Sequence, residues 1–241
     1  MHDSVTIMDI TFRNTTQQAF VNDYVEPRLL AEQPYYIVTA NPEIVMKTRS
    51  DSRYKQSVQQ ADVIVPDGAG ILLAAKIMKQ PLEERVAGFD VMLDLLAFAD
   101  QHGLSCYFLG AEEAVNERAV AEVKRRFPNV AIAGRQHGFF QLDDPEVAEN
   151  AAAAQADLIF VALGLPRQEL WIAEHRDKFT KGVFMGVGGS FDVLAGTAKR
   201  APDIWIKLNL EWLYRLLKQP LRFKRILKVF EFLLRVVFRK T

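Results

Sequence analysis

The sequence predicts an α/β protein: a Rossmann-like, mostly parallel sheet with flanking helices, followed by a basic amphipathic helical appendage at the C-terminus. Two observations support this prediction. Short apolar runs alternate with helical patterns over the first 198 residues, and the charge changes sign at residue 199. With 241 residues, 49% of them hydrophobic, the chain can bury one large core. We therefore expect a core domain over residues 1–198 and an appendage over residues 199–241.

Six short runs rich in β-branched and aromatic residues predict the strands. Most are continuous rather than alternating, which is typical of parallel strands covered on both faces. The helical patterns between them end near a Gly, a Pro or a new apolar run, as in βαβ units. The predicted strands are Tyr35–Ala40, Val63–Val65, Cys106–Gly110, Val130–Ala133, Leu158–Leu163 and Val183–Val187. The predicted helices between them include Gly88–His102, Ala111–Phe127 and Pro145–Ala156.

The appendage differs from the core in charge and in pattern. Residues 199–241 hold twelve Lys and Arg against three Asp and Glu, a charge of +9, which the rest of the chain balances with −9. Pro220 divides the appendage into two predicted helices, Pro202–Lys218 and Leu221–Lys240. In the second helix, apolar residues at helical spacing form one face, and basic residues lie away from it. The apolar face consists of Phe223, Ile226, Leu227, Phe230, Leu233, Leu234 and Val237.

Three interpretations of this helix are open. A basic amphipathic helix can lie in the interface of an anionic membrane. Alternatively, its apolar face packs on the protein core or on a second subunit, which would make the protein a homo-oligomer. Nucleic acid is the weakest interpretation, because no binding motif accompanies the charges. The sequence has no secretory signal and no apolar run that could span a bilayer, and Cys106 is its only cysteine. We expect a cytoplasmic protein, peripheral on the inner face of the cell membrane.

Candidate site residues are the polar groups just after the predicted strands, where ligands bind in open α/β sheets. Asp67 follows the run Val63–Val65 and is our candidate for a general base. The competing interpretation is that Asp67 caps the next helix. The glycines at 68 and 70 let a ligand approach, but the third glycine of a dinucleotide fingerprint is missing, so a nicotinamide site is only weakly indicated.

Other strand ends offer further candidates. Thr39 lies at the end of the first predicted strand and Asn41 directly after it, where helix capping is an equally good explanation of Asn before Pro. Arg85, before a predicted helix, could grip a diphosphate, although most surface arginines near a helix start have no specific role. Gly164 and Gly188 precede helices and could expose N–H groups to a phosphate, while tight turns alone would also explain them.

Several familiar chemistries lack their motifs. No P-loop occurs, the four histidines are scattered, and one cysteine cannot build a zinc cluster. No Asp-x-Asp occurs to hold a divalent ion on a sugar diphosphate. We therefore expect no metal and no cofactor, with charge neutralisation by Arg and Lys.

Taken together, six stretches resemble the WecG/TagA/CpsF family of glycosyltransferases. They occur in the family's order and span about residues 35 to 225, and jointly they are specific although each alone is weak. They are Thr39-Ala40-Asn41-Pro42-Glu43, Pro66-Asp67-Gly68, Arg85-Val86-Ala87-Gly88-Phe89-Asp90, Val161-Ala162-Leu163-Gly164-Leu165-Pro166-Arg167-Gln168-Glu169, Gly188-Gly189-Ser190-Phe191-Asp192-Val193, and Lys199-Arg200-Ala201-Pro202 with Leu210-Glu211-Trp212-Leu213-Tyr214-Arg215.

The resemblance implies an inverting, metal-independent transfer of N-acetylmannosamine from UDP-ManNAc to undecaprenyl-diphosphate-linked GlcNAc, as for the wall teichoic acid linkage unit. The alternatives are another UDP-sugar, in capsule, exopolysaccharide or enterobacterial common antigen synthesis, and a non-catalytic nucleotide-binding or membrane-tethered protein. By motif, Asp67 would be the base and Arg85 would steady the diphosphate. The resemblance also implies a pocket and a membrane-directing appendage. By motif, Thr39 and Asn41 would position the donor sugar or the acceptor, Gln168 would line the same pocket, and Arg215, Arg222 and Arg225 are candidates for neutralising the leaving UDP. Gly164, Gly188 and Asp192, in the glycine turns after two predicted strands and the helix that follows, are further candidates for substrate binding.

Overall fold

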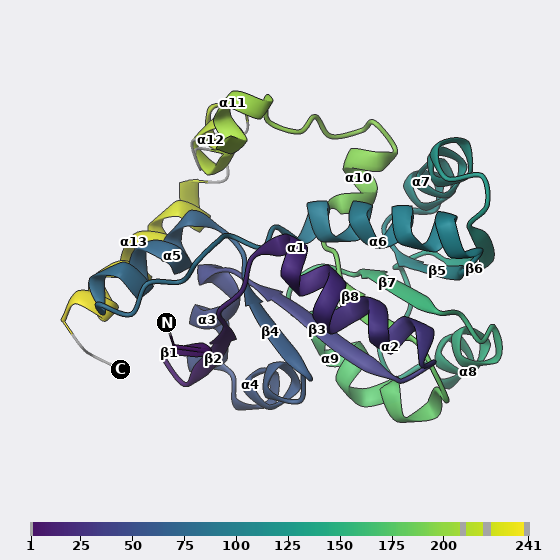
Figure 1. Ribbon diagram of the computed structural model, residues 1–241, viewed down its shortest axis with the longest axis horizontal. Helices are drawn as coiled ribbons and strands as arrows, with labels where there is room; N and C mark the ends of the chain where they lie inside the picture. Colours follow the sequence, from purple (N-terminus) through teal and green to yellow (C-terminus); the bar gives the residue numbers. More distant parts are fainter. Residues whose placement is uncertain (1, 208–210, 219–222, 239–241) are drawn as a thin grey trace.

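The computed structural model describes residues 2–207, 211–218 and 223–238, and its centre is a six-stranded parallel sheet with helices on both faces (Figure 1). The strand order is β4-β3-β8-β7-β5-β6. All six predicted runs are strands, so the predicted fold class is confirmed. The strands are β3 (Tyr35–Ala40), β4 (Val63–Pro66), β5 (Ser105–Gly110), β6 (Ala131–Gln136), β7 (Leu158–Ala162) and β8 (Val183–Gly186).

The two faces of the sheet carry separate apolar cores. Alternate residues of β3 show the division: Tyr36 and Val38 belong to one core, and Tyr35 and Ile37 to the other. Both sides of each central strand are therefore covered, which explains the continuous apolar runs. One core lies under α3 (Pro42–Ser50), α4 (Ser52–Gln59), α8 (Pro145–Ala153) and α9 (Arg167–His175). The other lies under η1 (Phe20–Val25), α2 (Glu26–Leu30), α6 (Gly88–His102), α7 (Glu113–Arg126) and α10 (Ser190–Leu194).

Of the predicted strands, β6 departs furthest from its predicted range. The apolar run ended at Ala133, but the strand continues to Gln136. Because β6 lies at the edge of the sheet and has no fully buried residue, it can include polar residues such as Arg135. Apolar composition therefore marks the central strands better than the edge strand.

A hairpin near the N-terminus was missed by the sequence analysis. Its strands β1 (Ser4–Ile7) and β2 (Ile10–Arg13) pair antiparallel and bury alternate residues such as Val5 and Ile7. The turn residues Met8 and Asp9 have φ of 50° and 65°, in the left-handed region. Such turns are usually recognised by Asn-Gly or Asp-Gly, so this hairpin lacked its usual sequence signal. A short α1 (Gln17–Ala19) follows it.

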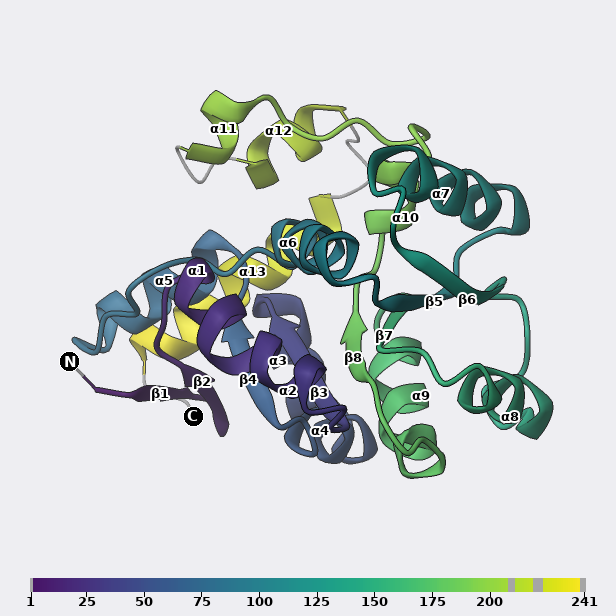
Figure 2. The same ribbon diagram turned by 45° about the vertical axis from the view of Figure 1, so that its right-hand side comes forward.

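The appendage contains three described helices rather than the two predicted. They are α11 (Asp203–Lys207), α12 (Glu211–Lys218) and α13 (Phe223–Val237). Figure 2 shows α11 and α12 over one edge of the sheet, above α6, while α13 lies beside α5 (Ala69–Ile77). The division of the chain at residue 199 stays a prediction, since α13 packs directly against α3 and α5 of the core.

The packing of α13 on the core uses a different face from the predicted one. The buried residues are Phe232 and Val236, with the half-buried Val229 beside them. Gly70 permits this contact, because a Cβ there would lie 2.6 Å from Pro42 Cγ and 3.3 Å from Val229 Cγ1. Glycine at position 70 therefore lets side chains of α3 and α13 lie close against the backbone of α5.

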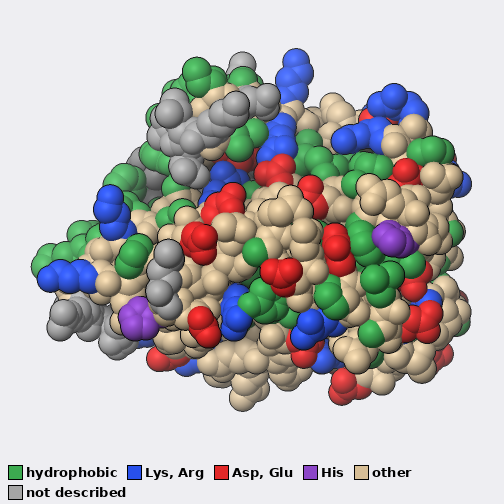
Figure 3. All heavy atoms as spheres, viewed as in Figure 1, with side chains coloured by type: hydrophobic (Ala, Val, Ile, Leu, Met, Phe, Trp, Pro, Cys, Tyr) green, Lys and Arg blue, Asp and Glu red, His purple; other side chains and the backbone are tan. Residues whose placement is uncertain are grey.

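Most of the predicted apolar face of α13 remains on the surface. Leu227, Phe230, Leu234 and Val237 are all at least half exposed, so the interpretation that this face packs on the core is wrong for them. Leu233 is half-buried, and the side chains of Phe223 and Ile226 lie outside the described part of the chain. In Figure 3, hydrophobic side chains with Lys and Arg beside them gather at the left end of the molecule, over α5 and α13. Within the described ranges, no helix has the length and apolar character needed to cross a bilayer.

Two phenylalanines of α13 give a matched test of this packing. Phe232→Ala should lower the free energy of unfolding by about 3–5 kcal/mol, because it removes a fully buried ring and leaves a cavity. Phe230→Ala, two residues away and 56% exposed, should change it by less than about 0.5 kcal/mol. Urea unfolding followed by circular dichroism measures both. Equal losses in the two variants would contradict the packing of Phe232 against the core.

Candidate active site

The sheet brings the predicted strand-end residues to one edge. β3 and β4 are paired in parallel up to Ala40 and Pro66, and the Asp67 N–H continues the ladder by donating to the Ala40 carbonyl at 3.0 Å. On the other side, β8 lies between β3 and β7, and the Val187 N–H donates to the Val161 carbonyl at 2.9 Å. The turns after β3, β4, β7 and β8 therefore lie side by side at the carboxyl edge, where ligands bind in such sheets.

Asp67 and Arg85 form an ion pair at this edge. Arg85 Nε donates to Asp67 Oδ1 at 3.2 Å, and Arg85 Nη2 donates to Glu211 Oε2, from α12, at 2.8 Å. The loop that carries Arg85 is fixed to the end of β4, because the Val86 N–H donates to the Pro66 carbonyl at 2.8 Å. The side chains of Asp67, Arg85 and Glu211 are 25%, 15% and 8% exposed, so the cluster is only partly open to solvent.

The surroundings of Asp67 suit a base rather than a helix cap. The N-cap of α5 is Gly68, with φ of 89° and no side-chain cap, so Asp67 does not cap the helix that follows it. Its Oδ2 instead faces the N–H of Gly88 at 3.5 Å, at the start of α6. Burial raises the pKa of the Asp67 carboxyl, Arg85 opposes that rise, and the negative charge of Glu211 adds to it. A raised pKa makes this carboxylate a stronger proton acceptor once it is ionised.

Thr39 and Asn41 lie next to this cluster. A Cβ on Gly88 would lie 2.7 Å from Thr39 Oγ1, so Thr39 and Asp67 meet at the same glycine. Asn41 is the N-cap of α3, and its Oδ1 accepts from the N–H groups of Glu43 and Ile44 at 2.9 and 3.0 Å. The capping interpretation of Asn41 is therefore confirmed, while any role of its side-chain amide towards a ligand stays a prediction.

Gln168 ties two of the glycine turns together. Its backbone N–H donates to the Gly164 carbonyl at 3.1 Å, and its Oε1 accepts from the Gly188 N–H at 3.1 Å. A Cβ on Gly186 would lie 2.5 Å from Gln168 Nε2, so a larger residue there would displace the Gln168 side chain. The Gly188 N–H is thus already paired, and a phosphate could take it only by displacing Gln168. Gly164, with φ of 72°, serves a tight turn.

The remaining predicted residues are distributed more widely. Asp192 lies in α10, where its carbonyl accepts from the N–H groups of Thr197 and Ala198 at 2.9 and 3.0 Å. Arg222 lies outside the described residues, as do the side chains of Arg215 in α12 and Arg225 in α13, so their roles stay predictions.

Two groups at the site were missed by the sequence analysis as functional residues. Glu211 was quoted only within a family stretch, although it reaches Arg85. Arg200 pairs with Asp90 at 2.6 Å and lies over the Phe89 ring at 4.8 Å, which joins the start of the appendage to α6. Only their place in motif stretches could have indicated them, because pairing across more than 100 residues leaves no local pattern.

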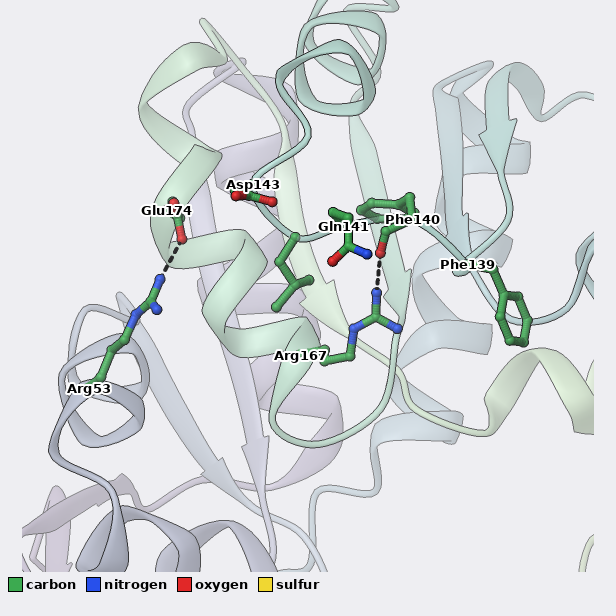
Figure 4. A pocket seen from close by; sticks show the side chains of 8 residues that line it. Arg53, Phe139, Phe140, Gln141, Asp143, Arg167 and Glu174 are labelled. Carbon is green, nitrogen blue, oxygen red and sulfur yellow. Dashed lines mark hydrogen bonds and ion pairs between the residues drawn. The ribbon is translucent and has the colours of Figure 1, made fainter.

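A separate hollow of about 720 Å³ lies along α9 (Figure 4). Arg167 crosses it and donates to the Phe140 carbonyl at 2.7 Å, and Arg53 pairs with Glu174 at 2.9 Å on its other side. None of the predicted site residues whose side chains the structure describes lines this hollow. It is therefore distinct from the cluster around Asp67.

Glu169 is a buried carboxyl directly behind the glycine turns. It is 2% exposed, and its Oε1 accepts from Gln168 Nε2 at 2.8 Å, while its Oε2 has no hydrogen-bond partner among the described residues. Burial raises the pKa of Glu169 to about 7, despite the opposing hydrogen bond from Gln168. The folded protein therefore binds this proton more tightly than the unfolded chain does.

This burial predicts a pH-dependent stability difference for Glu169→Gln. Because the folded-state pKa lies above the unfolded value of 4.5, the wild type loses stability as pH rises from 4.5 to about 7. The Gln variant keeps the hydrogen bond from Gln168 without this loss. It should match the wild type below the window and exceed it by about 3 kcal/mol above pH 7. Denaturant unfolding at a series of pH values measures the difference.

The exposed Glu174 of the same helix is the matched control for that measurement. Glu174→Gln should alter stability by less than about 1 kcal/mol throughout, as expected of an exposed ion pair. A gap between Glu169→Gln and the wild type that stays constant with pH would contradict the burial of an ionisable carboxyl at this position.

Fold and site together define a Rossmann-like protein in which a carboxylate of raised pKa pairs with an arginine at the carboxyl edge of the sheet. Such a pair can accept a proton next to an anionic group. The chain belongs to the Glycosyl transferase WecG/TagA/CpsF family, which it matches over residues 5–241. It is therefore a glycosyltransferase, as the six sequence stretches predicted.

Individual relatives agree with the family match. Three of them bear the name N-acetylglucosaminyldiphosphoundecaprenol N-acetyl-beta-D-mannosaminyltransferase. The protein of Bacillus spizizenii is 40% identical over 92% of this chain and 86% of its own length. The protein of Bacillus subtilis is 37% identical over 96% and 90%, and that of Staphylococcus aureus is 38% identical over 98% and 93%.

Proposed function

We propose that this chain transfers N-acetylmannosamine from UDP-ManNAc to undecaprenyl-diphosphate-linked N-acetylglucosamine, with a β linkage in the product, as in the wall teichoic acid linkage unit. Support comes from the shared name of the three relatives, which align along at least 86% of their own lengths. The alternative of another UDP-sugar is not favoured by these names. A non-catalytic nucleotide-binding protein would not need a proton-accepting carboxylate at position 67.

The observation that supports the chemistry most strongly is the Asp67–Arg85 pair at the carboxyl edge. In the proposed reaction, Asp67 accepts the proton of the acceptor hydroxyl. The hydroxyl oxygen bonds to the anomeric carbon as the bond from that carbon to the diphosphate oxygen breaks. Arg85 stabilises the charge that develops on the departing UDP. One displacement of this kind inverts the anomeric configuration, so one base and a stabilised leaving group suffice.

The remaining predicted residues have supporting roles in this proposal. Thr39, beside Gly88, orients the sugar or the acceptor, as does the Asn41 amide. Gln168 holds the glycine turns at the edge. Arg215, Arg222 and Arg225 add positive charge near the diphosphate.

The proposal places the enzyme on the inner face of the cell membrane, where its lipid-linked acceptor lies. The exposed apolar residues of α13, with Lys228 exposed beside them, suit the interface of an anionic bilayer. The acceptor's undecaprenyl chain would then remain in the bilayer while its sugar reaches the site.

UDP release against a panel of donors tests this function. With a short-chain lipid-diphosphate-GlcNAc acceptor, UDP-ManNAc should be used at least about tenfold faster than UDP-GlcNAc, UDP-GalNAc or UDP-glucose. Release without acceptor measures hydrolysis and serves as the background. Equal or faster turnover with another UDP-sugar would contradict the proposed donor.

A further inference from the structure

Arg85 is shared between two carboxylates that lie far apart in the sequence, Asp67 after β4 and Glu211 in α12. Arg85 Nε donates a hydrogen bond to Asp67 Oδ1 at 3.2 Å, and Arg85 Nη2 donates a shorter one to Glu211 Oε2 at 2.8 Å. Glu211 is 6% exposed, so the appendage inserts an almost fully buried acid beside the proposed base. Buried carboxylates are costly unless they are paired, which makes this contact more than a surface ion pair.

Because Arg85 binds two carboxylates at once, the orientation of its guanidinium is fixed. A guanidinium can grip a single carboxylate with two parallel N–H groups, and this is its preferred geometry with an isolated partner. Here Glu211 takes the Nη2 side, so Asp67 receives one hydrogen bond through Nε. The N–H groups of Nη1 take part in no hydrogen bond with the described residues, which leaves them for an incoming anion.

We propose that Glu211 is a positioning residue of the transferase site: it holds Arg85 so that Asp67 stays accessible to the acceptor hydroxyl and Nη1 stays accessible to the donor diphosphate. The proposal rests on the proposed function, in which Asp67 is the base. Without Glu211, Arg85 can turn both N–H groups onto Asp67, which covers the base and withdraws the cation from the diphosphate.

Glu211 also affects the proton affinity of Asp67. Among the described residues, two charged groups face Asp67: Arg85 from the loop before α6, and Glu211 from α12, while α6 itself presents the Gly88 amide. Burial has the largest effect on the pKa of Asp67 and raises it, while the positive charge of Arg85 lowers it. The negative charge of Glu211 has a smaller effect and also raises this pKa. Removing that charge should lower the pKa of Asp67. The acid limb of the pH–rate profile should then move to lower pH, whereas a residue that only supports the fold would leave the limb in place.

The test uses the full-length protein, UDP-ManNAc and a detergent-dispersed lipid-diphosphate-GlcNAc acceptor. Glu211→Gln, of the same shape, should lower kcat by about 100-fold, the size of effect expected when a reacting group is misplaced. Its acid limb should move to lower pH. Glu231→Gln is the matched control: it removes the same charge from the appendage, but on α13, where Glu231 is exposed and pairs with Arg235 at 2.8 Å. The control should retain the wild-type kcat and pH profile.

Glu211→Asp separates the position of this carboxylate from its charge. It keeps the negative charge but is one methylene shorter, so kcat should fall while the acid limb stays at the wild-type pH. Thermal unfolding of each variant establishes that it is folded.

The proposal is overturned if folded Glu211→Gln retains the wild-type kcat, or if its activity falls with no movement of the acid limb. It is also overturned if Glu231→Gln loses activity to the same extent. Failure of the proposed function has a different signature, which is transfer activity in Asp67→Asn. An inactive Asp67→Asn together with a fully active Glu211→Gln would reject only the role of Glu211.

Discussion

Asp67→Asn is expected to lower kcat by about three orders of magnitude, within the range for loss of a general base. The amide has the size of the carboxylate and can still accept the hydrogen bond from Arg85 Nε, so the donor should bind with little change in Kd. The loss should therefore appear in kcat and not in donor binding. Transfer of labelled ManNAc, with UDP-sugar binding followed by calorimetry, measures the two quantities separately.

Asp9→Asn is a suitable control for this substitution. Asp9 lies in the β1–β2 turn, is 62% exposed at its side chain and pairs with Lys55 at 2.8 Å, far along the chain from the carboxyl-edge turns. The Asp9→Asn variant should have the wild-type kcat. Wild-type turnover in Asp67→Asn itself would reject Asp67 as the base.

The second large effect concerns membrane binding. The double substitution Phe230→Ser with Leu234→Ser should lower the partition constant onto anionic vesicles by about 100-fold, since a fully buried Phe or Leu contributes about 1.5–3 kcal/mol. These two side chains are both 56% exposed and lie on the face of α13 away from the core, so folding should be unaffected. Sedimentation with vesicles rich in anionic lipid measures the constant.

A matched double substitution separates this effect from a general loss of apolar surface. Leu30 and Phe139 are 60% and 72% exposed on other parts of the molecule. Replacing both by Ser removes the same two residue types but should leave sedimentation unchanged. If the two double variants bind vesicles equally, α13 is not the membrane-binding element.

The sequence could predict the central sheet because its strands are buried on both faces and so appear as continuous apolar runs. Asp67 and Arg85 were predictable for a related reason: both stand near the carboxyl ends of strands or the start of a helix, where the fold itself directs side chains to a ligand. The β1–β2 hairpin was missed because its Met8-Asp9 turn lacks glycine and its strands are only four residues long.

The appendage shows the limit of periodicity. α13 is apolar on two adjacent faces, and spacing alone cannot tell which face meets the protein. The surface of the core makes that choice: Gly70 leaves room beside Pro42, and Phe232 and Val236 occupy the contact. The role of Glu211 was likewise not predictable from local sequence, because its partner Arg85 lies 126 residues earlier in the chain.

We propose that the donor diphosphate binds at the carboxyl edge of the sheet, beside Arg85 and Asp67. A crystal structure of the protein with bound UDP tests it most directly. We predict that UDP lies across the ends of β3 and β8, with a phosphate oxygen within hydrogen-bond distance of Arg85. UDP bound instead in the hollow lined by Phe139 and Arg167, with Arg85 still enclosed by its two carboxylates, would contradict the account.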